Sequence, residues 1–282
     1  MHPTLIFPWI HCYGLMLAIG FYSAWWLAAR RAKAEGIHPD LIGNLVLISI
    51  LAGIVGSRLL WFALFRKPDH SVWVLFEIWE GGLVFYGGLI AALIAGYIYL
   101  RAAHAEVWQL ADIVAPSVAL GQACGRIGCF LNGCCYGGLA TAAFPLAVRF
   151  PGFLDTHGEP GGSAVFVDHA SHFPTLVAPP ASLPIHPTQL YEALSLLAVT
   201  LLLVAATPHK RRHGQVLALL CILNALPRIG VELVRRDVAR PSTWPSAGMI
   251  GGLGVLAFGL ALLLWARRRG KPVPWNASAS ES

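Results

Sequence analysis

Charged residues are scarce in this chain. Asp, Glu, Lys and Arg make up 12% of its 282 residues, whereas a soluble domain usually carries about 25%. Hydrophobic residues make up 56%, and the mean hydropathy is +0.63. The apolar residues come in blocks of about 20, the length that a helix needs to cross a hydrocarbon core about 30 Å thick. The composition therefore excludes an ordinary soluble domain and predicts a polytopic membrane protein.

Other absences narrow the class of membrane protein. The four lysines, Lys33, Lys67, Lys210 and Lys271, all fall outside the apolar blocks, so none can form a retinal Schiff base. No GxSxG-type serine lies within a block, which argues against an intramembrane serine protease. No inverted repeat of the transporter kind is visible, and no segment alternates as a barrel strand does.

The fold class that we expect is all-α, with seven transmembrane helices, because backbone amides in lipid must be satisfied within the segment. The first ten residues, MHPTLIFPWI, lack the basic region and cleavage site of a signal peptide, so we expect the first span to be retained. The expected spans are 10–29, 41–65, 82–100, 109–135, 185–206, 214–234 and 244–265.

The distribution of basic residues predicts the orientation. With the N-terminus outside, the cytoplasmic segments hold eleven Lys and Arg residues and the external segments hold six. The positive-inside rule therefore favours a multi-pass protein of a bacterial inner membrane, with the N-terminus outside and the C-terminus cytoplasmic. We expect one membrane domain, 1–270, with a proline-rich external head at 139–184 and a disordered cytoplasmic tail at 271–282. The excess of basic residues is explained by this orientation, so it does not indicate a nucleic-acid partner.

Three arginines, Arg58, Arg126 and Arg228, lie inside the expected spans, although a charge at the bilayer centre costs about 2.5–3.5 kcal/mol. In the expected orientation all three fall near the outer face. The inward-running spans begin at the same depth with further polar groups: His11, Tyr13, Tyr86, His186, Glu192. We therefore predict a shared polar cavity near the outer leaflet.

The charge of this cavity indicates its ligand. Two or three arginines would line the cavity with only Glu192 and Glu232 as nearby acids, so we expect a net positive pocket. Guanidinium groups stay charged in a low dielectric and match phosphate geometry. The residues alone therefore predict a site for an anionic phospholipid that enters from outside, and they do not specify a reaction.

The stretch GRIGCFLNGCCYGG, residues 125–138, adds three cysteines, Cys129, Cys134 and Cys135. In an oxidising compartment two of them can form a disulfide. A structural zinc site needs four well-spaced ligands, and no second Cys/His pair with metal spacing is nearby, so we expect no metal site. Free cysteines that act as small apolar residues are the expected state, with a disulfide as the alternative.

At GRIGCFLNGCCYGG the chain resembles the bacterial prolipoprotein diacylglyceryl transferases. HCYGLMLAIGF, GGLVFYGGLI, PLAVRFP, HPTQLYE and RIGVELVRRD resemble the same family, in its order along the chain. The resemblance implies transfer of a diacylglyceryl group from phosphatidylglycerol to the lipobox cysteine of a prolipoprotein, which gives a thioether and glycerol phosphate. It implies no cofactor, and its partners are the lipid, the lipobox segment and the membrane.

The resemblance also implies site residues. Arg126 and Arg228 would bind phosphate, and both would be catalytic together with Tyr86, His186 and Glu232. The residues that would bind substrate are Arg126, Tyr13, Asn132 and Gly137. The predicted cavity adds Arg58 to this set.

The chain departs from the family pattern at three positions. Tyr86 stands where many members have histidine, Cys129 where members often have asparagine, and Cys134 where they often have glutamate. The alternative hypothesis is therefore a non-catalytic paralogue that binds an anionic phospholipid or a lipoprotein.

Overall fold

The computed structural model describes residues 12–66, 71–77, 81–141, 143–157, 159–173, 180–234 and 246–273. Within these ranges seven helices are long and apolar enough to cross a membrane. They are α1 (Cys12–Ala34), α2 (Pro39–Phe65), α3 (Phe85–Ala102), α4 (Val107–Asn132), α6 (Thr188–Ala206), α7 (Gln215–Val234) and α8 (Ala247–Arg269). The prediction of an all-α membrane protein with seven spans is confirmed. His11 and four of the basic residues used for the orientation (Lys67, Arg235, Arg236, Arg240) lie outside the described residues.

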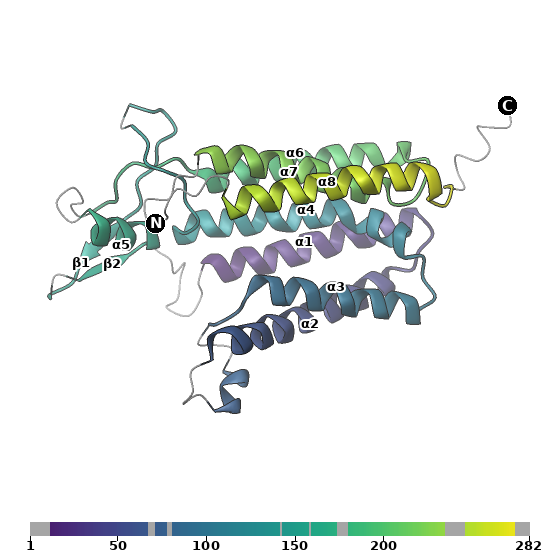
Figure 1. Cartoon of the computed structure of the whole chain (residues 1–282), viewed down its shortest axis with the longest axis horizontal. Coiled ribbons are helices and arrows are strands. Elements are labelled where there is room, and N and C mark those ends of the chain that lie inside the picture. Colours follow the sequence, from purple (N-terminus) through teal and green to yellow (C-terminus); the bar gives the residue numbers. More distant parts are fainter. Residues whose placement is uncertain are drawn as a thin grey trace. The chain divides into compact units, whose positions relative to one another are not determined.

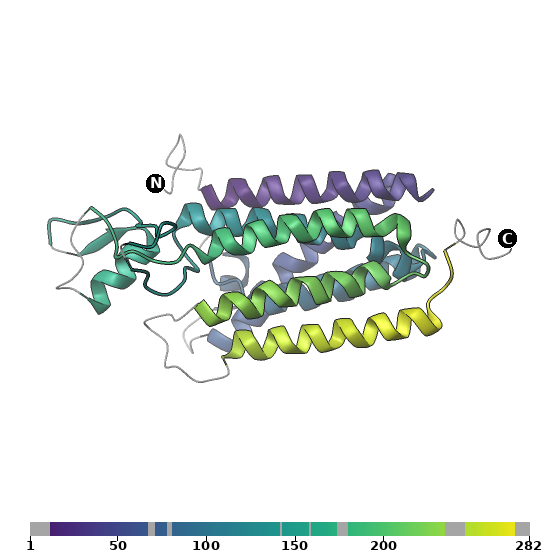
Figure 2. The ribbon, with the colours of Figure 1, turned by 90° about the horizontal axis from the view of Figure 1, so that it is seen from above.

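The chain forms two compact units, and their boundary falls within α1 and α4. The first unit comprises residues 1–24 and 112–282, and the second comprises 25–111. In the first unit α6 packs on α7 and α7 packs on α8, and these helices lie alongside α4 (Figures 1 and 2).

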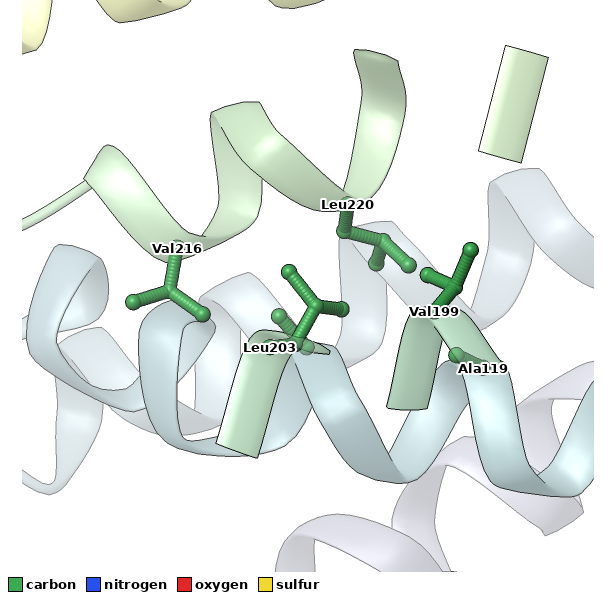
Figure 3. Close-up of a cluster of buried hydrophobic side chains, with 6 residues drawn as sticks. Ala119, Val199, Leu203, Val216 and Leu220 are labelled. Atoms are coloured by element: carbon green, nitrogen blue, oxygen red, sulfur yellow. The ribbon is translucent and has the colours of Figure 1, made fainter. Parts of the chain in front are cut away.

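The core of the first unit is apolar and is shared by three helices. Ala115 and Ala119 come from α4, Val199 and Leu203 from α6, and Val216 and Leu220 from α7. Figure 3 shows the α6 and α7 side chains meeting over Ala119. The side chains that α4 contributes to this core are small alanines, as is typical where membrane helices pack.

A buried carboxylate ties α4 to the start of α7. Asp112 is fully buried, and its two oxygens accept hydrogen bonds from the backbone N–H groups of Gly214, Val216 and Leu217, each at 2.9 Å. Lys210 Nζ lies 3.9 Å from the same carboxylate. These backbone donors have no partner within the helix, so Asp112 satisfies the first turn of α7 from a distant part of the chain.

The connection between α4 and α6 is a folded head at one end of the first unit (Figure 1). It contains the antiparallel strands β1 (Gly152–Leu154) and β2 (Pro160–Gly162), with Phe153 opposite Gly161, followed by the helix α5 (Ala164–His172). Phe150, Val165 and Ile185 form its buried core, against which Phe130 of α4 packs. The head is therefore anchored to the end of α4 by apolar contacts.

The second unit is built on close contact between α2 and α3. A Cβ atom on Gly56 would lie 2.3 Å from Ala91 Cβ, and one on Gly87 would lie 2.4 Å from the Gly56 carbonyl oxygen. Only glycine fits at either position. A short 3-10 helix, η1 (Val72–Phe76), lies in the connection between these helices.

Beyond α8 the described chain returns to the α6–α7 connection. His213 N–H donates to the Lys271 carbonyl, and Val273 N–H donates to the Arg211 carbonyl. The rest of the expected tail, 274–282, lies outside the described residues.

Candidate active site

The end of α4 lies within the stretch GRIGCFLNGCCYGG, residues 125–138, and fixes its position. Gly133 has a φ of +67°, a left-handed conformation that glycine adopts readily. Its N–H donates to the Phe130 carbonyl, and the Cys134 N–H donates to the Cys129 carbonyl. This pair of hydrogen bonds is a Schellman motif, which ends the helix and folds the chain back on its last turn. The expected span 109–135 therefore ends at Asn132.

Two arginines from different helices meet at one glutamate. Arg126 of α4 places Nε 2.7 Å from Glu192 Oε2, and Arg228 of α7 donates from NH1 to Glu192 Oε1 at 2.9 Å. Glu192 belongs to the second turn of α6, and its side chain is only 6% exposed. The side chains of Arg126 and Arg228 are 26% and 31% exposed, so a ligand can reach the cluster.

A second carboxylate extends this cluster. Glu232 lies one turn beyond Arg228 on α7, with its Oε2 3.6 Å from Arg228 NH2. Its Oε1 accepts a hydrogen bond of 2.7 Å from Ser246 Oγ, the N-cap of α8. A Cβ on Gly248 would lie 2.7 Å from this carboxylate, so the glycine leaves space for it. Four helices, α4, α6, α7 and α8, therefore contribute to one cluster.

The cluster is formally neutral, because its two arginines are matched by two glutamates. The sequence predicts a net positive pocket instead, because it allows a third arginine, Arg58, in the same cavity. Arg58 belongs to the second unit, and the ion pairs described above involve only Arg126 and Arg228. Within the described part of the chain, Glu192 is the one ion-pair partner of Arg126, and it contacts Nε. The two terminal NH2 groups of Arg126 therefore remain available to a ligand.

The predicted residues His186 and Gly137 lie together where the chain enters α6. Gly137 N–H donates to the His186 carbonyl, and His186 N–H donates to the Gly138 carbonyl. A Cβ on Gly137 would lie 2.6 Å from Thr188 Cγ2, so the close approach requires glycine. The half-buried His186 ring packs against Phe144 at 4.7 Å between ring centroids.

The predicted residues Asn132 and Tyr13 flank the same end of α4. Asn132 is the last residue of the helix and is half-buried. Tyr13, at the start of α1, packs on Gly128, where an added Cβ would lie 3.1 Å from the tyrosine ring. Asn132 therefore lies about two turns beyond Arg126 on α4, and Tyr13 contacts this helix two residues beyond Arg126.

The remaining two predicted residues, Arg58 and Tyr86, belong to the second unit. Arg58 is buried and donates hydrogen bonds to the carbonyls of Val74, Glu77, Gly81 and Gly82. Its guanidinium also lies over the Trp61 ring. These contacts hold the connection between α2 and α3. Tyr86 is exposed at the start of α3, beside Phe85.

Sequence reasoning counted Glu192 only as a nearby acid, whereas the structure makes it the centre of the cluster. One sequence signal was available, since Glu192 lies four residues after Thr188 on the same face of α6 as Gln189. Gln189 is fully buried and donates to the Cys134 carbonyl at 2.8 Å. A helix face that buries both an amide and a carboxylate indicates a polar interior.

Comparison with known proteins identifies the family. The chain matches the prolipoprotein diacylglyceryl transferase family over residues 4–265. It is 33% identical to the phosphatidylglycerol–prolipoprotein diacylglyceryl transferase of Chromohalobacter salexigens, over 92% of this chain and 89% of the relative. It is 32% identical to the proteins of the same name from Proteus mirabilis, over 94% and 90%, and from Legionella pneumophila, over 92% and 93%. This chain belongs to the prolipoprotein diacylglyceryl transferase family.

Proposed function

We propose that the chain transfers the diacylglyceryl group of phosphatidylglycerol to the lipobox cysteine of prolipoproteins. The observation that carries this proposal is the bridge Arg126–Glu192–Arg228, in which one buried carboxylate holds two guanidinium groups from separate helices. Such groups bind a phosphodiester without reorganisation during the reaction. Family membership over nearly the whole chain supports the same activity.

The cluster suggests a division of tasks. Glu192 holds the Nε edge of Arg126, which leaves the terminal NH2 groups free to bind two phosphate oxygens in parallel. Arg228 adds a second positive group, and Glu232 orients it from the next turn. The charge that develops on the departing phosphate oxygen is then stabilised by fixed donors. Tyr13, Asn132, Gly137 and His186 shape the surroundings in which the lipid and the thiol are aligned.

The proposal includes a topology. The N-terminus and the head, 139–184, lie outside the inner membrane, and the C-terminus is cytoplasmic. The arginine cluster then lies toward the outer leaflet, because Arg126 is only six residues from the end of α4 where the head begins. Labelling of cysteines introduced in the head and after α8, in intact cells with an impermeant reagent, tests this orientation.

The direct test uses purified protein in vesicles that contain phosphatidylglycerol, with a lipobox peptide as acceptor. Mass spectrometry should find the thioether-linked diacylglyceryl peptide and glycerol phosphate. Arg126→Lys should lose most of this activity, because it keeps the charge but loses the planar pair of donors. Arg66→Lys is the matched control, since Arg66 follows α2 in the second unit.

A non-catalytic paralogue is the second candidate, and the substitutions at Tyr86, Cys129 and Cys134 favour it. Such a protein would bind phosphatidylglycerol or a lipoprotein and give no thioether product. The vesicle assay separates the two, provided that the protein tested is folded and inserted.

A further inference from the structure

Three cysteine thiols gather at the end of α4, the helix that carries Arg126. The sulfur atoms of Cys129, Cys134 and Cys135 all lie within 4.8 Å of one another. Cys135 is exposed and the other two are half-buried, so the group can be reached from solvent. No step of the proposed transfer described so far uses these thiols.

The backbone builds this arrangement. The Schellman hydrogen bond from Cys134 N–H to the Cys129 carbonyl brings the fourth-last residue of the helix against the second residue beyond its end. Cys135 has a φ of +58°, a conformation that costs a non-glycine residue about 1–2 kcal/mol. Two hydrogen bonds from α6 hold it there, from Gln189 Nε2 to the Cys134 carbonyl and from Thr188 Oγ1 to the Cys135 carbonyl. Strain of this kind persists where the surroundings impose it, and it is concentrated at functional sites.

The spacing of the sulfurs suits a thiophilic cation. A zinc ion binds thiolate sulfur at about 2.3 Å, which places three such sulfurs about 4 Å apart. Small side-chain rotations would therefore close the observed group around one ion. A structural zinc site needs four protein ligands, and the described part of the chain offers three here. A catalytic zinc site has three protein ligands and keeps its fourth position open for water or substrate.

We propose that Cys129, Cys134 and Cys135 bind a zinc ion whose open position takes the acceptor thiol of the lipobox. This inference rests on the proposed function, which requires a thiolate nucleophile. A free thiol has a pKa of about 8.5 and is mostly protonated at neutral pH. A thiol that coordinates zinc is deprotonated outright, and metal coordination is one of the ways in which nucleophiles are activated.

The location fits the reaction. Cys129 lies three residues after Arg126 on the same face of α4, which corresponds to about 4.5 Å along the helix axis. The acceptor thiol loses its proton to water as it binds the ion. Its sulfur then forms a bond to the glyceryl carbon, the bond between this carbon and the phosphate oxygen breaks, and the electron pair remains on the glycerol phosphate. Arg126 and Arg228 bind the departing phosphate, and the lipid thioether leaves the ion.

Cobalt(II) serves as the probe, because it takes the same ligands as zinc and its thiolate complexes absorb in the near ultraviolet. The full chain, reduced with a phosphine in detergent, should bind one cobalt ion and give this thiolate band. Cys129→Ser, Cys134→Ser and Cys135→Ser should each weaken cobalt binding by more than about 100-fold. Cys124→Ser on the same helix and Cys221→Ser on α7 should retain the band.

The second measurement adds the lipobox peptide without lipid. The cysteine peptide should intensify and shift the cobalt band, because it supplies a fourth thiolate, and the matching serine peptide should not. Absence of the thiolate band in the wild-type protein overturns the proposal, and so does a band that the cysteine peptide leaves unchanged. Both measurements remain informative if a variant fails to fold, because they can be made on the wild-type chain.

The transfer assay on the same samples separates this inference from the proposed function. Removal of the metal should lower the transfer rate at least about tenfold, and added zinc should restore it. Full transfer by metal-free protein overturns the zinc site and leaves the proposed function intact. A peptide-dependent cobalt band without any transfer supports the site and rejects the transferase activity.

Discussion

Glu192→Gln is the substitution that tests the arginine cluster most directly. The amide has nearly the same shape as the carboxylate, so the packing of α6 is retained. It carries no charge, and it can accept a hydrogen bond through only one of its two end atoms. One of the two arginines, Arg126 or Arg228, must therefore lose its partner, because the amide nitrogen is itself a donor.

The magnitude follows from the two short contacts. Glu192 lies 2.7 Å from Arg126 and 2.9 Å from Arg228, and its own side chain is almost fully buried. A hydrogen bond to a charged group contributes about 1.5–3 kcal/mol. Because the arginines are partly exposed, water compensates for some of this loss. We therefore expect a smaller loss, about 1–2 kcal/mol in transition-state stabilisation, which corresponds to about a 5- to 30-fold decrease in kcat/KM.

The vesicle assay with the lipobox peptide measures this decrease as an initial rate. Glu159→Gln, on an exposed residue of the head, is the matched control and should transfer at the wild-type rate. The double variant Glu192→Gln/Arg126→Lys should lose less than the sum of the two single losses, because both changes break the same contact. A folded Glu192→Gln protein with wild-type kcat/KM would refute the idea that this carboxylate positions the arginines.

Three further predictions concern stability. Asp112→Asn should lower the free energy of unfolding by about 1–3 kcal/mol, and the thermal unfolding temperature with it, because at least one of three buried backbone donors loses its acceptor. The transfer rate of the protein that remains folded should not change. Gly56→Ala should lower the free energy of unfolding by about 1–3 kcal/mol, because the added methyl group forces α2 and α3 apart. Gly254→Ala is the control and should be tolerated, because an added Cβ there has no neighbouring atom within 4 Å. The fraction of each variant that stays monodisperse after heating measures both effects. Burial lowers the pKa of His169 in α5 below its usual value of 6.5. The unfolded head therefore binds a proton that the folded head resists, so the stability of the head should fall as the pH falls below about 6.5. The protection factors of the α5 amides, which are hydrogen-exchange rates corrected for the intrinsic effect of pH, should decrease over this range, and His169→Phe should remove the decrease.

The membrane spans could be predicted from the sequence, because the thickness of the bilayer fixes their length and the cost of burying charge fixes their composition. All seven expected spans correspond to helices. The ends of these helices were predicted less accurately than their number. The fourth ends at Asn132 because the left-handed conformation of Gly133 stops it, and apolar composition alone does not mark that position.

The head was recognised only as a long proline-rich connection. Its strands have three residues each, too few for a periodic pattern, and they exist because Gly152 and Gly162 pair across the hairpin. A Cβ on Gly152 would lie within 2 Å of the Phe166 ring, so the packing of α5 on β1 depends on a contact that no local pattern predicts.

The sequence by itself determined that this is a polytopic membrane protein, which residues carry charge into the membrane, and that Arg228 and Glu232 share a helix face. These properties depend on composition and on helical spacing, which are local. Only the tertiary structure decided that Glu192 joins Arg126 to Arg228 and that three cysteine sulfurs converge at the end of α4. Those contacts depend on how α4, α6 and α7 pack and on how the chain turns back at the end of α4, and both require atoms that are distant in sequence to meet in space.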